Sequence, residues 1–131
     1  MKGSFADYYT VEEVNNLMNM YHENFKDIVQ SVETLGETYE GNNISMITFH
    51  NISEITVDTP VIYLTALIQG NDFSGLANVF YIMKRIIYLY VHNNQEMKYL
   101  LSTRVIKIVP VLNVDAYLKS QEEYLDNSKF I

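Results

Sequence analysis

Polar side chains that could carry acid or base chemistry follow two apolar segments of this sequence. Gln69 and Asp72 come directly after the apolar run 61–68, and Asp115 follows a shorter apolar run at 105–109. If both runs are parallel strands, their carboxyl ends meet at one edge of a sheet, where open α/β sheets bind their ligands. Asp72 and Asp115 would then be placed as a pair of carboxylates for acid and base catalysis.

Both carboxylates also have a structural explanation, which we favour. Asp72 comes just before an apolar pattern of helical period, and a negative charge is favourable at a helix N-terminus. Asp115 is placed to hold its own turn, because Asp side chains readily bond to the backbone of a turn. The catalytic interpretation therefore stays open as the weaker of the two.

The three histidines, His22, His50 and His92, are too far apart in the sequence to form a metal-binding pair on one helix. Such a pair needs two histidines about one helical turn apart, as in the His-Glu-x-x-His pattern. We therefore expect surface or capping roles for all three. The sequence contains no cysteine, which excludes disulfides, thiolate metal sites and cysteine nucleophiles.

The composition predicts one packed domain that covers residues 1–131. Hydrophobic residues make up 48% of the sequence and charged residues 19%, which argues for a globular core and against disorder. The formal net charge of −7 repels nucleic acid and anionic membrane surfaces. Since no apolar run is long enough to span a bilayer, we expect no membrane insertion. The N-terminus also lacks the apolar stretch of a secretory signal, so the cytosol is the default expectation.

The first half of the sequence predicts one helix and a pair of antiparallel strands. Thr10 and Glu13 form a capping box ahead of a helical pattern at 11–23. Alternating apolar residues predict strands at 28–35 and 44–49, which a turn rich in Gly and Asn connects.

The second half predicts a strand, two helices and a final strand. The run 61–68 is almost continuously apolar, as expected for a central strand that is covered on both faces. A long helix at 74–92 and a short one near 95–101 lead to the strand at 105–109, and the tail after Tyr117 is polar and helical or frayed. This order predicts an α/β fold with a mixed, mainly parallel sheet of about four strands and helices on both faces.

Four local motifs, in this order along the chain, resemble those of the zinc carboxypeptidases of the carboxypeptidase A type. Residues 8–13 resemble the opening Tyr-x-Thr-x-x-Glu of that family, and residues 35–44 resemble its Ile-Gly-x-Ser-x-Glu-Gly-Arg-x-Ile turn. Residues 61–72 fall where the family has its metal-binding strand and its His-x-x-Glu motif. Residues 109–117 resemble its Pro-x-x-Asn-Pro-Asp-Gly-Tyr. The resemblance implies the fold of the N-terminal half of such a domain, with Gly41, Asn113 and Asp115 as matching turn residues.

The departures from the family pattern fall on residues that carry its function. In the family the His-x-x-Glu motif supplies two zinc ligands, but here Gln69 stands at the His position and Asp72 at the Glu position. A carboxamide is a poor zinc ligand beside imidazole. Asn42 replaces the Arg of the Glu-Gly-Arg turn, which helps to bind substrate. The third zinc ligand and the general-base Glu of the family would lie beyond Ile131.

The resemblance therefore implies a relative of zinc carboxypeptidases that has lost its metal site. We expect no catalytic residue and no bound zinc, although zinc is the cofactor of the family. The expected role is structural or in an interaction, with a protein partner or a second copy covering an open edge of the sheet. The alternatives are a metallocarboxypeptidase that a missing segment or a partner chain completes, and a fragment without an independent role.

Overall fold

The structure, a computed structural model, describes residue 3 and residues 8–128. Its elements follow one another in the order that the hydrophobic periodicity predicts. They are α1 (Val11–Asn24), β1 (Val29–Glu37), β2 (Asn43–Phe49), β3 (Val61–Thr65), α2 (Phe73–Val91), α3 (Gln95–Thr103), β4 (Val105–Val109) and α4 (Val114–Ser128). The polar tail after Tyr117 is thus largely helical, as far as the structure describes it.

The strands form one mixed sheet in the order β1-β2-β4-β3. β1 and β2 form the expected antiparallel hairpin, and β3 lies parallel to β4. The mixed α/β class is confirmed, but β2 also runs antiparallel to β4, so the parallel share is smaller than the sequence suggested. β4 therefore has a parallel neighbour on one side and an antiparallel neighbour on the other.

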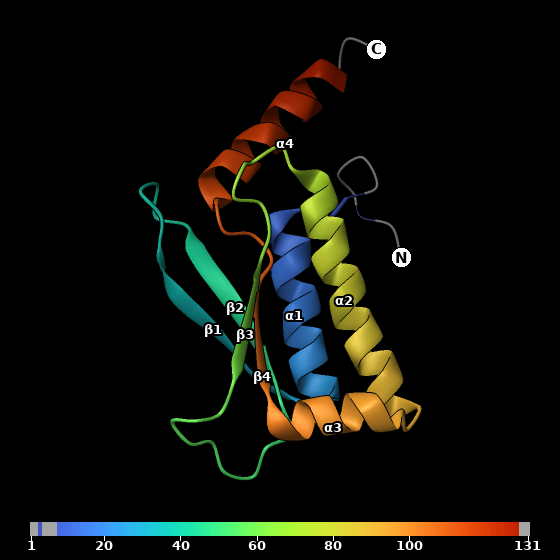
Figure 1. Cartoon of the computed structure of the whole chain (residues 1–131). Helices are drawn as coiled ribbons and strands as arrows, with labels where there is room; N and C mark the ends of the chain where they lie inside the picture. The colour runs from blue at the N-terminus through green and yellow to red at the C-terminus, as the bar shows by residue number, and fades with distance from the viewer. Residues whose placement is uncertain (1–2, 4–7, 129–131) are drawn as a thin grey trace.

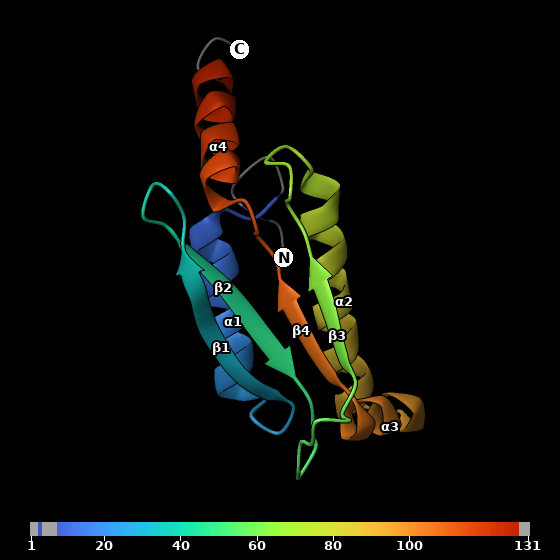
Figure 2. The same cartoon turned by 60° about the vertical axis from the view of Figure 1, so that its left-hand side comes forward.

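The two long helices α1 and α2 lie on the same face of the sheet, as Figures 1 and 2 show. The expectation of helices on both faces is therefore wrong for the described residues. Ile47 and Ile108 face the helices, whereas Thr48 and Lys107, one position along each paired strand, face the other way. α3 lies across the end of the sheet where β4 begins, and α4 extends past the opposite end (Figure 1).

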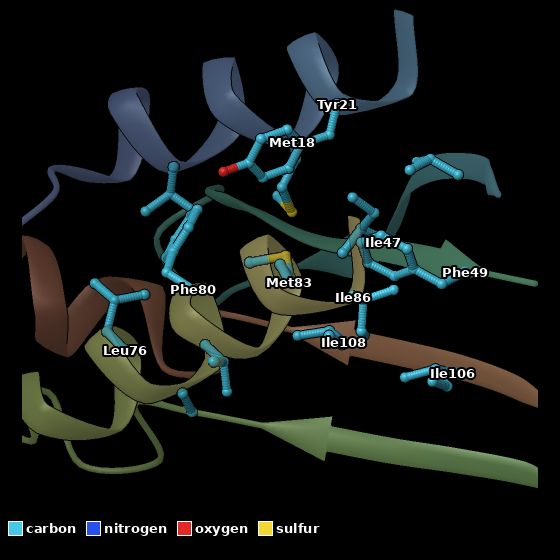
Figure 3. Packing of buried hydrophobic residues seen from close by; sticks show 14 of the residues in the cluster. Met18, Tyr21, Ile47, Phe49, Leu76, Phe80, Met83, Ile86, Ile106 and Ile108 are labelled. Atoms are coloured by element: carbon cyan, nitrogen blue, oxygen red, sulfur yellow. The ribbon is translucent and has the colours of Figure 1, made fainter. Parts of the chain in front are cut away.

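The core fills the space between this sheet face and the two helices (Figure 3). Met18 of α1 and Met83 of α2 point at one another there, above Phe49 and Ile108 of the sheet, and all four side chains are fully buried. Burial of each such side chain stabilises the fold by about 1.5–3 kcal/mol. Apolar packing of the helix stripes therefore holds both helices against β2 and β4.

Each of the first three helices begins at a side chain that accepts a hydrogen bond from the backbone of the first turn. The predicted capping box of Thr10 and Glu13 is present in both directions. Asp72 caps α2 and Asn94 caps α3 in the same manner. None of the helices that the structure describes is both long and apolar enough to cross a membrane.

The strand expected at 61–68 ends at Thr65 and lies at the edge of the sheet. Leu67 adopts a left-handed backbone with φ 54°, which no strand continues. The carbonyl groups of Ala66 and Leu67 instead accept hydrogen bonds from Leu112 and Asn113, at 3.0 and 2.9 Å. The expectation of a central strand covered on both faces is wrong for the described residues, because β3 has a strand neighbour on one side alone and four of its five residues are exposed.

Candidate functional site

Three loops meet at the end of the sheet where β3 and β4 finish (Figure 1). They are the β1–β2 turn at 38–42, the segment 66–72 before α2 and the segment 110–113 before α4. The amide of Asn113 donates to the carbonyl of Ile68 over 3.1 Å, which ties the second loop to the third. This end of the sheet therefore gathers all the sequence-predicted site residues other than the histidines.

Asp115 binds the β1–β2 turn rather than its own turn, which corrects the structural explanation favoured from the sequence. Its carboxylate accepts a hydrogen bond from the Thr38 hydroxyl over 2.5 Å and from the Asn42 amide over 2.8 Å. The backbone N–H of Glu40 donates to the second carboxylate oxygen over 3.2 Å. The Thr38 hydroxyl in turn accepts from the backbone N–H of Asn42 over 3.0 Å. Asp115 thus ties the start of α4 to a turn more than seventy residues earlier in the chain.

These hydrogen bonds hold the pKa of Asp115 below its usual value. The Thr38 hydroxyl lowers the pKa most and the Asn42 amide comes next, because both donate to the charged form of the carboxyl group. A general acid at neutral pH needs the opposite shift, because it has to keep its proton. At neutral pH Asp115 is therefore placed as a hydrogen-bond acceptor rather than as a general acid.

Asp72 lies exposed at the N-terminus of α2, as the structural interpretation expected. Its carboxylate accepts from the Ser74 hydroxyl over 2.9 Å and from the backbone N–H of Gly75 over 3.3 Å. Asp72 and Asp115 therefore bind separate partners, one in its own helix and one in the β1–β2 turn. Among the described residues they share no hydrogen-bond partner, which leaves the carboxylate-pair hypothesis without support.

Gln69 presents an exposed side chain in the loop between β3 and α2. Its carbonyl accepts from the backbone N–H of Asp72 over 3.1 Å, so Gln69 begins the turn that leads into the helix. Next to it, Gly70 is buried, and a Cβ there would lie 2.4 Å from the carbonyl carbon of Ala116. Gly70 therefore lets the loop lie directly against the first turn of α4.

The remaining motif residues shape the turns that surround these groups. Gly41 has a φ of +80°, a left-handed conformation that glycine adopts without a steric cost. The side-chain oxygen of Asn113 accepts from the backbone N–H of Ala116 over 3.3 Å at the start of α4. Gly41 and Asn113 are thus placed as turn-forming residues.

The three histidines all lie at the opposite end of the sheet. His22 donates through Nδ1 to the carbonyl of Val29 over 3.0 Å, and His92 donates through Nδ1 to the carbonyl of Tyr88 over 2.8 Å. Nδ1 of His50 accepts from the backbone N–H of Ile52 over 3.1 Å. Burial lowers the pKa of His50, which favours the neutral ring that this acceptor role requires. Each histidine is thus held by backbone groups at a helix or strand end.

The residues at the candidate site do not fit a zinc ion. Zinc in proteins takes imidazole, thiolate or carboxylate ligands, usually three or four of them. Of the two positions at the β3–α2 junction, one holds the carboxamide of Gln69 and the other the helix-capping carboxylate of Asp72. Within residues 8–128 no three His, Cys, Asp or Glu residues are grouped so that they could hold a metal.

Sequence reasoning missed Thr38 and the tyrosine contacts beside the site. Thr38 falls inside the motif 35–44, but the spacing of that motif does not show that its hydroxyl meets Asp115. The Tyr117 hydroxyl donates to the carbonyl of Tyr9, and the Tyr117 ring packs against Phe73 with 5.9 Å between ring centroids. Burial raises the pKa of Tyr117 well above its usual range. The only available signal was the position of Tyr117 in the last of the four motifs.

Comparison with known proteins gives the same family as the motifs. The family model described as zinc carboxypeptidase matches residues 14–129. The fold resembles a crystal structure of thrombin-activatable fibrinolysis inhibitor with a TM-score of 0.77 and 18% identity, over 89% of this chain and 28% of that one. It also resembles carboxypeptidase A from Helicoverpa armigera with a TM-score of 0.72 and 23% identity, over 89% and 27% of the two chains. No curated protein matches the sequence closely enough to count as a relative.

A metallocarboxypeptidase from Burkholderia cenocepacia gives a TM-score of 0.68 at 20% identity, over 85% of this chain and 28% of that one. At such identities the structural likeness shows a shared fold. The chain spans less than a third of the length of each of these three structures. The family model, in contrast, matches most of the present sequence. On that match, and with a fold that agrees with it, the chain belongs to the zinc carboxypeptidase family.

Proposed function

We propose that this chain is a catalytically inactive member of the zinc carboxypeptidase family with a structural or interaction role. The observation that carries the proposal concerns Gln69 and Asp72, which stand at the β3–α2 junction where the family resemblance places two zinc ligands. Gln69 offers an exposed carboxamide there, and Asp72 directs its carboxylate to the backbone of α2. A zinc ion that polarises a carbonyl and activates water is held by imidazole, thiolate or carboxylate ligands that are free to bind it, and these two side chains do not provide such a set.

The substrate-binding side of the site supports the same proposal. By the family resemblance, Asn42 stands where an Arg helps to bind substrate. The Asn42 amide is neutral and already donates to Asp115 over 2.8 Å. It therefore lacks the charge that pairs with a carboxylate of a substrate, and its donor group is engaged in holding a turn. The hydrogen bond between Asn42 and Asp115 thus supports a structural role for this end of the sheet.

Native mass spectrometry of the protein purified from its own cells tests this proposal. We expect the mass of the chain without metal, either alone or with a bound protein. A mass shift of one zinc ion per chain or per complex would overturn the proposal. The same experiment identifies any partner, because a complex that survives ionisation carries the partner's mass.

A pair of variants tests whether the ligand positions themselves limit metal binding. Gln69→His with Asp72→Glu restores the His-x-x-Glu pattern at this junction, and we expect tighter binding of zinc by calorimetry than in the parent chain. Gln69→Asn with Asp72→Glu is the matched control, since it changes the same positions without adding an imidazole. Stoichiometric zinc in the parent chain at micromolar concentration would contradict the proposal.

The second candidate function is a metallocarboxypeptidase that further polypeptide completes. The observation in its favour is that the chain spans only 27–28% of the solved structures that it resembles over most of its own length. In this function the missing ligands would come from a further segment or from a partner chain. Release of C-terminal residues from short peptides by the complex isolated from cells, abolished by a chelator, would establish it. Absence of release by a complex of confirmed composition would exclude it.

A further inference from the structure

Residues 8–10, which we call the N-terminal segment, pack against the first half of α2. The Tyr8 ring lies on Phe73, with 5.3 Å between ring centroids, and the Tyr9 ring lies on Phe80 at 4.9 Å. Aromatic pairs at such distances attract one another beyond the burial of their area. The N-terminal segment is therefore held on α2 by two ring contacts.

The N-terminal segment also supplies hydrogen-bond partners to α4. The Tyr117 side chain is fully buried, and its hydroxyl donates to the carbonyl of Tyr9. A buried hydroxyl without such a partner would be costly. One helical turn further on, the side-chain oxygen of Gln121 accepts from the backbone N–H of Val11 over 3.3 Å. The inward side of α4 is thus bonded to the N-terminal segment and to the start of α1.

The same part of α4 holds the β1–β2 turn. Asp115 lies two residues before Tyr117, and its carboxylate accepts from Thr38 over 2.5 Å and from Asn42 over 2.8 Å. Beyond these contacts α4 extends past the end of the sheet (Figures 1 and 2), and residues 122–127 are all exposed. The first turns of α4 therefore contact both the β1–β2 turn and the N-terminal segment.

We propose that α4 couples the N-terminal segment to the β1–β2 turn, so that releasing Tyr9 from Tyr117 also loosens the contacts of Asp115. The physical reason is that Asp115 and Tyr117 belong to one helical turn, which backbone hydrogen bonds keep rigid. A small shift of this turn therefore moves both side chains together. By the family resemblance, Asn42 stands where an Arg helps to bind substrate, so the coupling reaches the candidate site.

The coupling acts in both directions, because an equilibrium coupling between two sites is reciprocal. A molecule that binds residues 8–10 and draws them away from α4 would loosen the β1–β2 turn. Loss of the Asp115 contacts would in turn weaken the hold of α4 on the N-terminal segment. This inference rests on contacts within the described chain and does not depend on whether the chain binds zinc or is an enzyme.

A double-mutant cycle in urea unfolding tests the coupling. Thr38→Val removes the hydroxyl that donates to Asp115, and Tyr117→Phe removes the hydroxyl that donates to Tyr9 while it keeps the ring. The double variant should lose less stability than the sum of the two single variants. Once α4 is released at one contact, it no longer maintains the other, so the second substitution costs less.

The matched control cycle combines Thr38→Val with Tyr99→Phe. Tyr99 is 65% exposed and lies on α3, at the other end of the sheet. These two substitutions should therefore be additive, as is usual for distant sites. An additive result in the Thr38 and Tyr117 cycle as well would overturn the proposal.

Amide hydrogen exchange, measured by NMR, separates this coupling from a general loss of stability. The backbone N–H of Asn42 donates to the Thr38 hydroxyl over 3.0 Å, and in Tyr117→Phe it should exchange roughly threefold faster or more. The N–H of Arg104, which donates to Leu100 over 2.9 Å at the end of α3, is the reference and should change little. Equal acceleration at Asn42 and Arg104, or none at Asn42, would contradict the coupling.

The reverse direction has its own measurement. Thr38→Val should accelerate exchange at Val11, whose N–H donates to Gln121. If Tyr117→Phe does not fold, Gln121→Met takes its place, because it removes the acceptor for Val11 and keeps a side chain of similar length. Gln121→Met should then accelerate exchange at Asn42, and an unchanged rate there would overturn the proposal.

Discussion

At the scale of single residues, the carboxylate of Asp115 is the centre of the candidate site. It accepts hydrogen bonds from one side chain of each flank of the β1–β2 turn, Thr38 and Asn42. A charged acceptor makes stronger hydrogen bonds than a neutral one. The turn and the start of α4 are therefore held together by a group whose charge depends on pH.

We predict that Asp115→Asn lowers the melting temperature and weakens the acid dependence of stability. The folded-state pKa of Asp115 lies below the unfolded value of 3.8, so its contribution is fully present only at pH values well above that unfolded value. It is lost as the pH falls through the lowered pKa. Urea unfolding between pH 2.5 and 6 measures this dependence. Glu122→Gln, on the exposed part of α4, is the control and should keep the acid dependence of the parent chain.

We also predict that the stability of the parent chain falls as the pH drops below about 6.5, because of His50. Burial lowers the pKa of His50 from 6.5, so the folded state disfavours the charged ring. The resulting stability is present above the unfolded pKa and is lost as the pH falls through the folded one. NMR titration should show His50 with a pKa below 6.5. His50→Asn keeps an acceptor for Ile52 without titrating, and a stability curve unchanged by this substitution would contradict the prediction.

At the scale of elements, the candidate site depends on how closely the β3–α2 loop approaches α4. Gly70 allows that contact, and the capping carboxylate of Asp72 begins α2 two residues further on. Both residues lie in the segment that the family resemblance assigns to metal binding. Here both have evident structural roles.

We predict that Gly70→Ala destabilises the fold by about 1–3 kcal/mol through overpacking. The added Cβ would lie 2.4 Å from the backbone of Ala116, which cannot move away as a flexible side chain can. Gly36→Ala is the matched control, because its Cβ would meet nothing within 4 Å. Equal urea midpoints for the two variants would show that the loop is not packed as described.

We predict that Asp72→Ala lowers the free energy of unfolding by about 1 kcal/mol, because the helix loses its N-cap. Asp72→Asn should retain most of that stability, since its side-chain oxygen still accepts from Gly75. Hydrogen exchange at the first turn of α2 provides a local measurement. If Asn were as damaging as Ala, the negative charge of Asp72 rather than its capping geometry would be the important property.

At the scale of the whole molecule, the chain has a fold that matches part of the solved zinc carboxypeptidase structures, with a well-packed core between two helices and a sheet. The apolar packing of α1 and α2 on β2 and β4 does not use the polar side chains of the candidate site, such as Gln69, Asp72 and Asp115. The fold is therefore expected to be stable without a metal ion.

We predict that neither a chelator nor added zinc shifts the melting temperature of the chain. A ligand that binds the folded state at a hundred times its dissociation constant stabilises by about 2.7 kcal/mol, which a melting curve readily detects. Scanning calorimetry with and without a chelator, and then with excess zinc, makes the measurement. Magnesium at equal ionic strength is the control for non-specific salt effects. A zinc-dependent rise in melting temperature would contradict the prediction and favour the enzyme hypothesis.

The sequence by itself determined the elements and the family. The capping box at Thr10 and the apolar stripe of α2 depend on residues a few positions apart, so local geometry is enough to predict them. The motif order gave the family, and the Gln69 and Asp72 substitutions are visible in the sequence alone.

Only the tertiary structure decided what Asp115, β3 and the sheet faces do. The partners of Asp115 lie more than seventy residues away, and no local pattern shows which turn a carboxylate will meet. The apolar run 61–68 has the composition of a buried central strand, yet β3 pairs with β4 on one side and with no strand of the described residues on the other. Hydrophobic periodicity shows which side chains avoid water. The order of the strands in the sheet, and the sheet face that the helices cover, depend instead on contacts between distant segments.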